Sequence, residues 1–445
     1  MILSKEDAEK LLKKILSYSK AESASVSIRG NNNYNLRYAL NSASTNGFSD
    51  SLSATITSNF GKKSGSIALT QFDDTAIENS VRKSEEIAKL TPDNKEFMPP
   101  LEKQSGYYEV QEFFEDTDNL TPESISDKIS YTLEKADSQD LLAAGLFNKK
   151  SGFTALGNTK DLFAYHKQTF SNFSSTMRTK DSSGSSKTEK SYADVNHLNV
   201  RNLSDKVAER AVLSKNPRPY EPGNYVTILD YAAACDMLNN LSFYLNRRSA
   251  DEGRSFFSDK ERGNKIGQKI VNEKVTIYSD PQSSIAPDSP FTSEGLPVKR
   301  TNWISGGTLE NLFMNRYWAE KKNSEPVPFP GNLIMEGSTK SLEDLIESTE
   351  KGIFVTRFWY IRQVDPKQAL LTGLTRDGVF LIENGKITSA INNFRFNESP
   401  LNVLNNIIDM STSEKSSGSE TGDSKIVVPA MKLSGFNFST VSDAI

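Results

Sequence analysis

The spacing of apolar residues differs between segments near the start of the chain, and each spacing predicts a helix or a strand. Between Ala8 and Leu16 they recur every three or four residues, the period of an amphipathic helix, and Ser4 is placed to cap it. The segments in which they alternate with polar residues, as in half-buried strands, are 34–40, 52–56 and 66–70. A capping-box pattern at Thr75 then begins another helix. Helix, sheet and helix in this order predict an α+β domain.

A junction between two domains is predicted near the middle of the chain. A helix beginning at Thr121 and Pro122 is followed by a strand-like pattern over 141–200. The segment 216–223 then contains three prolines, which exclude a regular helix there. We therefore expect two domains, 1–215 and 216–445.

Strand-like patterns separated by glycines make up much of the second half of the chain. We expect a strand over 225–229, a helix over 231–248 and another helix after Thr308. Asn384-Gly385 between two apolar runs is the strongest hairpin signal in the chain. The polar, Gly/Ser-rich tract 411–424 is expected to be a mobile loop.

Charge and composition argue against two classes of protein, those that bind nucleic acid and those that span a membrane. The 445 residues include 53 basic and 57 acidic ones, for a formal net charge of −4. No block of Lys and Arg occurs, so we do not expect nucleic-acid binding. No apolar run reaches about 18 residues, so we expect no membrane-spanning segment.

The compartment is predicted from the N-terminus and from the cysteine content. Residues 1–7 become charged at once and lack the apolar core of a signal peptide. Cys235 is the only cysteine, so no intrachain disulfide can form, which fits a reducing compartment. These features predict a soluble, cytoplasmic protein.

An ordered set of segments in the second half resembles the TldD/PmbA family, whose members have been labelled candidate modulators of DNA gyrase. These segments are 222–226 (PGNYV), 274–281 (KVTIYSDP), 293–297 (SEGLP), 306–312 (GGTLENL) and 376–387 (RDGVFLIENGKI). Their order and spacing match the family along nearly the entire second half. The first half agrees with the family in the layout of its elements.

The resemblance implies an architecture and an activity. It implies an N-terminal α+β domain of sandwich-like form and a larger, β-rich C-terminal domain with a mixed or antiparallel sheet and flanking helices. It also implies a proteolytic system in which two related subunits pair around an internal chamber. In the TldD-type subunit, a helix bearing HExxxH and a later cysteine hold zinc.

The zinc-binding residues are missing from this sequence. In a rough alignment, the ligand and base positions of the motif fall at Asn239, Asn240 and Tyr244, none of which is a good zinc ligand or general base. No cysteine follows Cys235. The chain thus resembles the PmbA (TldE-like) branch, and we expect neither a catalytic residue nor a metal ligand in it. Zinc is expected only in a TldD-type partner.

The isolated candidates for catalysis have simpler structural explanations. His166 and His197 lie in strand-like runs, and two histidines alone cannot complete a closed zinc site. Cys235 lies on an apolar helix face, which favours a buried, inert thiol over a nucleophile.

One aromatic and basic stripe is a candidate cavity or partner surface. Arg357, Tyr360 and Arg362 lie in a run of Phe and Tyr, and Arg and aromatic residues are enriched at interfaces. A core strand with solvated arginines is the alternative.

Three functions therefore stay open. The first is a non-catalytic PmbA/TldE-like subunit that pairs with a metal-bearing paralogue, or with itself as a homodimer, and helps to hold an unfolded peptide. The second is an autonomous metallopeptidase with non-standard ligands. The third is a regulatory binding protein with no proteolytic role.

Overall fold

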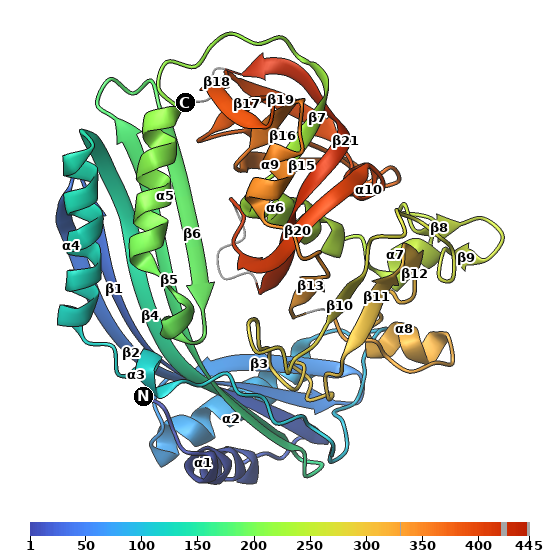
Figure 1. Ribbon diagram of the computed structural model, residues 1–445. Helices are drawn as coiled ribbons and strands as arrows, with labels where there is room; N and C mark the ends of the chain where they lie inside the picture. Colours follow the sequence, from blue (N-terminus) through green and yellow to red (C-terminus); the bar gives the residue numbers. More distant parts are fainter. Residues whose placement is uncertain (330, 420–424, 443–445) are drawn as a thin grey trace.

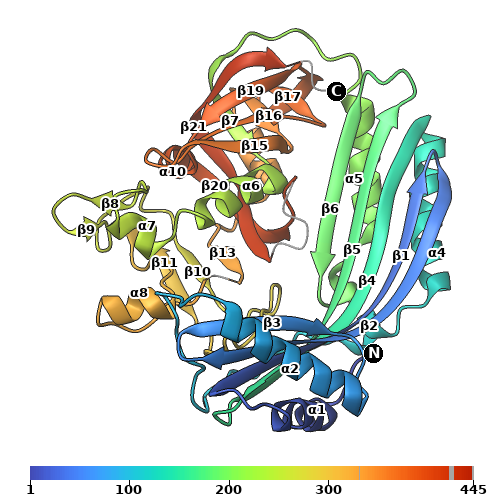
Figure 2. The same ribbon diagram turned by 180° about the vertical axis from the view of Figure 1, so that it is seen from behind.

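The computed structural model describes residues 1–329, 331–419 and 425–442. Two large β-sheets with flanking helices form an α+β fold, as predicted. Figures 1 and 2 show the long strands of the N-terminal half curving around one side and one end of the C-terminal half. Within the described residues, no helix combines the length and apolar character needed to cross a membrane.

The N-terminal half contains a six-stranded sheet in the order β3-β2-β1-β4-β5-β6, and each neighbouring pair is antiparallel. Its strands are β1 (Ser23–Ala39), β2 (Ser42–Phe60), β3 (Lys63–Leu69), β4 (Leu141–Asn158), β5 (Phe163–Thr179) and β6 (Ser185–Tyr192). Its helices are α1 (Lys5–Ser17), α2 (Asp74–Leu90), α3 (Glu115–Asp118), α4 (Pro122–Ser138) and α5 (Val200–Leu213), with a 3₁₀ turn η1 (Val195–His197).

Local sequence signals place these helices. The Ser4 hydroxyl accepts from the backbone N–H of Asp7, and Thr121 caps α4 ahead of Pro122. The second helix begins earlier than its capping-box pattern predicts, because Asp73 caps it.

Both pairs of long helices pack on one face of the sheet. Helices α1 and α2 share a core with Phe153, and α4 and α5 share one with Phe147. These two positions on β4 are six residues apart and therefore lie on the same face. The other face carries Leu156 and Ala164, which pack against Phe291 of the C-terminal half.

The C-terminal half is built on a thirteen-stranded mixed sheet. Its strands are β7 (Gly223–Leu229), β10 (Ile277–Ser279), β11 (Thr301–Ser305), β12 (Thr308–Leu309), β13 (Leu333–Met335), β14 (Lys351–Val355), β15 (Phe358–Asp365), β16 (Leu370–Thr375), β17 (Val379–Glu383), β18 (Lys386–Ala390), β19 (Asn393–Glu398), β20 (Ile407–Ser416) and β21 (Ile426–Ser442). A separate pair is β8 (Ser258–Asp259) with β9 (Gly263–Asn264). The helices are α6 (Tyr231–Ser242), α7 (Arg247–Asp251), α8 (Arg316–Lys321), α9 (Leu342–Glu347) and α10 (Pro400–Asn405).

The hairpin prediction is confirmed. Strands β17 and β18 pair antiparallel around Asn384 and Gly385, which have φ values of 52° and 73°. A two-residue turn with positive φ at both positions matches the twist of the flanking strands, and Asn-Gly adopts it readily.

Two helix predictions are wrong because tertiary pairing overrides local periodicity. The helix expected over 231–248 ends at Ser242, since Phe313 donates its N–H to Leu245 and accepts that of Arg247 in its place. The helix expected after Thr308 is instead β12, which pairs with β11, and α8 begins only at Arg316.

The predicted mobile loop over 411–424 is also wrong in its first part. Residues up to Ser416 belong to β20, which pairs with β21. Residues 420–424 lie outside the described part of the chain.

Candidate functional site

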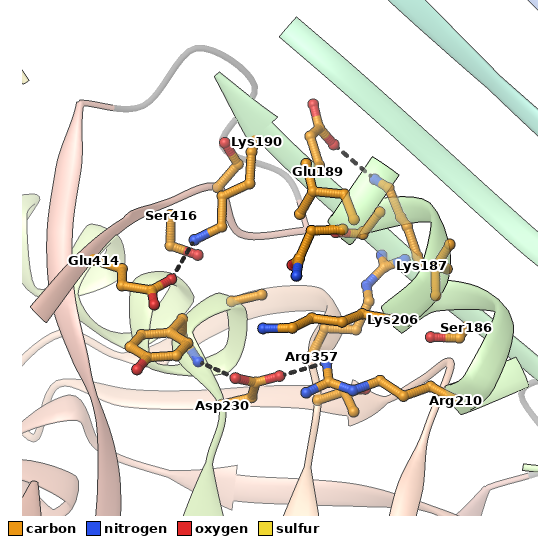
Figure 3. A pocket seen from close by; sticks show the side chains of 18 of the residues that line it. Ser186, Lys187, Glu189, Lys190, Lys206, Arg210, Asp230, Arg357, Glu414 and Ser416 are labelled. Atoms are coloured by element: carbon orange, nitrogen blue, oxygen red, sulfur yellow. Dashed lines mark hydrogen bonds and ion pairs between the residues drawn. The ribbon is translucent and has the colours of Figure 1, made fainter. Parts of the chain in front are cut away.

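A cleft of about 230 Å³ lies between the two halves of the molecule. Strand β6 and helix α5 form its N-terminal wall. The start of α6, residues 356–357 and the end of β20 form its C-terminal wall. Figure 3 shows its basic side chains entering from both walls.

Most basic groups of the cleft are already paired with a carboxylate. Arg210 on α5 lies 2.7 Å from Asp230, whose other oxygen caps α6 by accepting from the Tyr231 N–H. The remaining surface pairs are Lys187 with Glu189 at 2.9 Å and Lys190 with Glu414 at 3.3 Å. Two of these three pairs join the two halves of the chain.

Arg357 forms the most buried of these pairs. Its Nη1 lies 2.6 Å from Asp377, and its exposed fraction is 8%. The same carboxylate accepts a 2.7 Å hydrogen bond from the Ser185 hydroxyl of β6. Asp377 has a φ of 56° in the turn before β17, so an unusual backbone conformation presents its carboxylate to both halves.

Several polar groups of the cleft have no partner among the described residues. The buried atoms Arg357 Nε, Ser186 Oγ and Ser417 Oγ make no hydrogen bond. Lys206 on α5 also lines the cleft, and no ion pair or hydrogen bond of its ammonium group occurs in the described part of the chain. Buried polar atoms are almost always satisfied, so these groups mark a place where a ligand or water is expected.

Burial makes the two tyrosines of the cleft unsuited to general-base chemistry at neutral pH. Burial, together with the nearby Glu414, raises the pKa of Tyr192 to about 12. Burial also raises the pKa of Tyr231, although hydrogen bonding to Ser411 opposes the shift. His197 packs against the ring of Tyr192, and its imidazole makes no hydrogen bond to a described residue. The cleft therefore contains basic and hydrogen-bond-donating groups that suit an anion.

The three positions aligned with the family zinc motif lie outside this cleft and do not form a metal site. Asn240 donates to the backbone carbonyl of Asp236 one turn earlier, and Asn239 is half-buried on the same helix. Tyr244 follows the end of α6, where it is buried and accepts a 3.0 Å hydrogen bond from Gln363.

Zinc does not fit this donor set. Amide and phenol groups are poor zinc ligands beside imidazole, thiolate and carboxylate. Within residues 1–329, 331–419 and 425–442, no group of three or more His, Cys, Asp or Glu side chains is arranged to hold a metal ion.

The contacts of Cys235 and His166 indicate a structural role for both residues. Cys235 is fully buried in α6, and its thiol donates to the carbonyl of Ser416. His166 on β5 is buried with its Nε2 2.7 Å from Glu112. Glu112 also lies 2.6 Å from Lys425, which contacts Asp288 at 2.8 Å. We refer to Glu112, His166, Asp288 and Lys425 as the buried quartet.

The stripe predicted as a cavity or partner surface is divided by the fold. Arg357 lines the cleft, whereas Tyr360 and Arg362 are exposed on β15. There the Arg362 guanidinium lies 4.2 Å from the centre of the Tyr360 ring, and Arg376 stacks in the same way on Trp359. Tyr360 has a φ of 54° at a bulge in the β15–β16 pairing, which turns its ring outward.

Sequence reasoning did not identify Lys206, Ser186, Asp230 or Ser417 as site residues. The only local signal was the position of Asp230 immediately before α6, where Asp is a favoured helix cap. Lys206 is unremarkable on an amphipathic helix, and its lack of a partner depends on contacts between the two halves.

Comparison with known proteins identifies related sequences for the second half. Residues 222–440 match the family described as the PmbA/TldA metallopeptidase C-terminal domain. A metalloprotease of Methanocaldococcus jannaschii is 24% identical over 220 residues, which are 46% of this chain and 47% of that protein. The chain thus spans about half the length of this curated relative.

Solved structures extend the similarity of fold to nearly the entire chain. TldE from Thermococcus kodakarensis superimposes with a TM-score of 0.85 at 15% identity, covering 96% of this chain and 99% of that one. A Thermotoga maritima protein named as a candidate modulator of DNA gyrase gives 0.84 at 16% identity, with the same coverage. At these identities the likeness establishes the fold alone.

Proposed function

The chain belongs to the PmbA/TldD metallopeptidase family, and from this premise we propose that it acts as a PmbA/TldE-like, non-catalytic subunit of a peptidase. In this proposal a metal-bearing TldD-like paralogue supplies the hydrolytic centre. This chain closes the chamber and helps to hold an unfolded peptide. The proposal places the complex in the cytoplasm, in keeping with the single cysteine.

One observation carries the proposal. At the positions that the sequence analysis aligns with the family's metal-binding motif, this chain has Asn239 and Asn240 on α6 and a buried Tyr244 beyond its end. A zinc-bound water needs ligands that hold the ion and a base that takes the proton, and these three side chains provide neither.

The exposed part of β15 is a candidate contact for the partner. Trp359 and Tyr360 are 36% and 50% exposed, and both are stacked with arginine. Among the described strands, β15 pairs only with β16, so its other edge is available. Aromatic and arginine side chains dominate the binding energy of many interfaces.

Co-expression with an HExxxH-bearing paralogue tests the proposal. We expect a stoichiometric complex that cleaves an unfolded peptide, whereas neither chain does so alone. Elemental analysis should find zinc in the complex and in the paralogue but not in this chain. Replacing the glutamate of the HExxxH motif in the paralogue should abolish cleavage without causing the complex to dissociate.

Two variants of this chain sharpen the test. Tyr360→Asp should weaken the complex by about 10-fold or more if β15 lies in the interface. Leu90→Asp, at an exposed apolar residue on α2, is the control and should leave the affinity unchanged. One tightly held metal ion in this chain, with peptide hydrolysis by the chain alone, would contradict the proposal.

A further inference from the structure

The cleft between the two halves has a surplus of positive charge at one identifiable side chain. Each of its other lysine and arginine side chains lies against a carboxylate, as shown by Arg210 with Asp230 and Arg357 with Asp377. Lys206 has no such carboxylate among the described residues. Lys206 is exposed, so its unpaired ammonium group is accessible to an anion that enters the cleft.

Buried donors without a partner lie in the same cleft. Arg357 is held by Asp377 through Nη1, which leaves its Nε unbonded, and Ser186 Oγ is buried without a partner. Figure 3 shows the side chains of Lys206, Arg210 and Arg357 in the same view as Ser186, and all four residues line the cleft. A guanidinium N–H, a hydroxyl and an ammonium group together are donors suited to a carboxylate, which only accepts hydrogen bonds when ionised.

Two of the three unpartnered donors, Arg357 and Ser186, are also fixed in place. Asp377 is anchored by Ser185 of β6 and orients Arg357, while the backbone of β6 carries Ser186. A ligand would therefore meet groups whose positions are already determined, which lowers the entropic cost of binding.

We propose that this cleft binds a carboxylate of a peptide through Lys206, Arg357 Nε and Ser186 Oγ. The inference rests on the proposed function, in which this chain holds an unfolded peptide. It adds the group on the peptide that the chain recognises and the residues that recognise it. The carboxylate belongs either to the C-terminus of the peptide or to an Asp or Glu side chain, and the experiment separates these sources.

Lysine labelling tests the site directly. The purified full chain is acetylated with an N-hydroxysuccinimide ester, and the rate at Lys206 is measured by mass spectrometry with three N-acetylated, unstructured peptides. The first ends in a free carboxylate and contains no Asp or Glu. The second is its C-terminal amide, and the third is the amide with one internal Glu. Lys10, which is 78% exposed on α1, is the internal control.

Protection of Lys206 should follow the carboxylate. At a peptide concentration four times the dissociation constant, the free-acid peptide should slow acetylation of Lys206 about 5-fold, because about one fifth of the sites stay empty. The amide should give no protection, and the rate at Lys10 should not change. Protection by the third peptide assigns the subsite to acidic side chains as well. Equal protection by the acid and the amide would overturn the inference.

Two variants of Lys206, one that removes its charge and one that keeps it, separate recognition of the carboxylate from simple shielding of the lysine. Lys206→Met should weaken binding of the free-acid peptide about 10-fold, measured by fluorescence anisotropy, and leave the amide unaffected. Lys206→Arg should keep the preference for the acid, and Lys10→Met should behave as the unmodified chain. Unchanged affinity in Lys206→Met would also overturn the inference.

The inference and the proposed function can fail separately. If the complex with the paralogue cleaves peptides but no carboxylate protects Lys206, the inference alone is wrong. If Lys206 is protected and binding depends on its charge, yet no pairing yields a peptidase, the proposed function alone is wrong.

Discussion

Two groups of charged residues join the halves of this molecule, and they differ in how completely the charges neutralise one another. In the buried quartet, Lys425 lies between the carboxylates of Glu112 and Asp288, and His166 Nε2 lies 2.7 Å from Glu112. In the cleft, by contrast, Lys206 has no carboxylate among the described residues.

This difference distinguishes the charges that hold the two halves together from the charge that is available to bind a ligand. Charges taken out of water must be compensated by partners within the protein, and the ion pairs of the quartet provide this compensation between the two halves. The cleft is open to solvent, and a surplus ammonium group can stay hydrated there until an anion replaces the water. The same residue types thus have a structural role in one place and are available for a ligand in the other.

Removal of the central cation should have the largest effect. Lys425→Met leaves the buried Glu112 and the partly buried Asp288 without their shared counterion. We expect the free energy of unfolding to fall by about 3 kcal/mol, measured by urea denaturation. Lys10→Met, at an exposed lysine, is the control and should change it little. A loss below about 1 kcal/mol would mean that water already solvates these carboxylates.

Acidification should have a smaller effect, with a defined sign. Burial by itself would raise the pKa of Glu112, but the hydrogen bond with His166 and the charge of Lys425 together lower it below its ordinary value. A carboxyl group with a lowered pKa in the folded state contributes stability above its ordinary pKa, and this is lost as the pH falls through the folded value. The quartet should therefore weaken progressively below about pH 5.

The pH dependence of Glu112→Gln isolates this contribution. Between about pH 5 and pH 3, the variant should lose less free energy of unfolding than the unmodified chain, because its amide does not titrate. Glu9→Gln, in an exposed pair with Lys13 on α1, should keep the unmodified slope. An identical slope in Glu112→Gln and the unmodified chain would mean that the quartet does not stabilise the ionised form of Glu112.

The sequence allowed prediction of features that depend on near neighbours. The Asn384-Gly385 turn and the Thr121-Pro122 helix start depend on a few adjacent residues, and both were predicted correctly. The end of α6 depends on Phe313, some seventy positions later, and was predicted wrongly. The α+β class was predicted because many local signals agree on it.

The candidate site was predictable only in part for the same reason. Arg357 was selected because Arg and aromatic residues are enriched at interfaces, and the fold places it in the cleft while Tyr360 and Arg362 lie on the surface. Lys425 and Glu112 are 313 residues apart, so no local pattern links them. Whether a lysine is paired is a property of the folded chain, and Lys206 could not be distinguished from any other lysine.

The smallest expected effect concerns the stability contributed by Lys206 itself. Because no described residue pairs with it, Lys206→Met should shift the melting temperature by no more than about 1 °C. Arg210→Met, one helical turn further along α5, is the matched comparison: it removes the partner of Asp230 and should lower the melting temperature more. If the two variants were equally destabilised, Lys206 would be a structural cation like Lys425, and the contrast between cleft and quartet would fail. A stable Lys206→Met chain that loses its preference for carboxylates would instead establish that this charge is kept for a ligand and not for the fold.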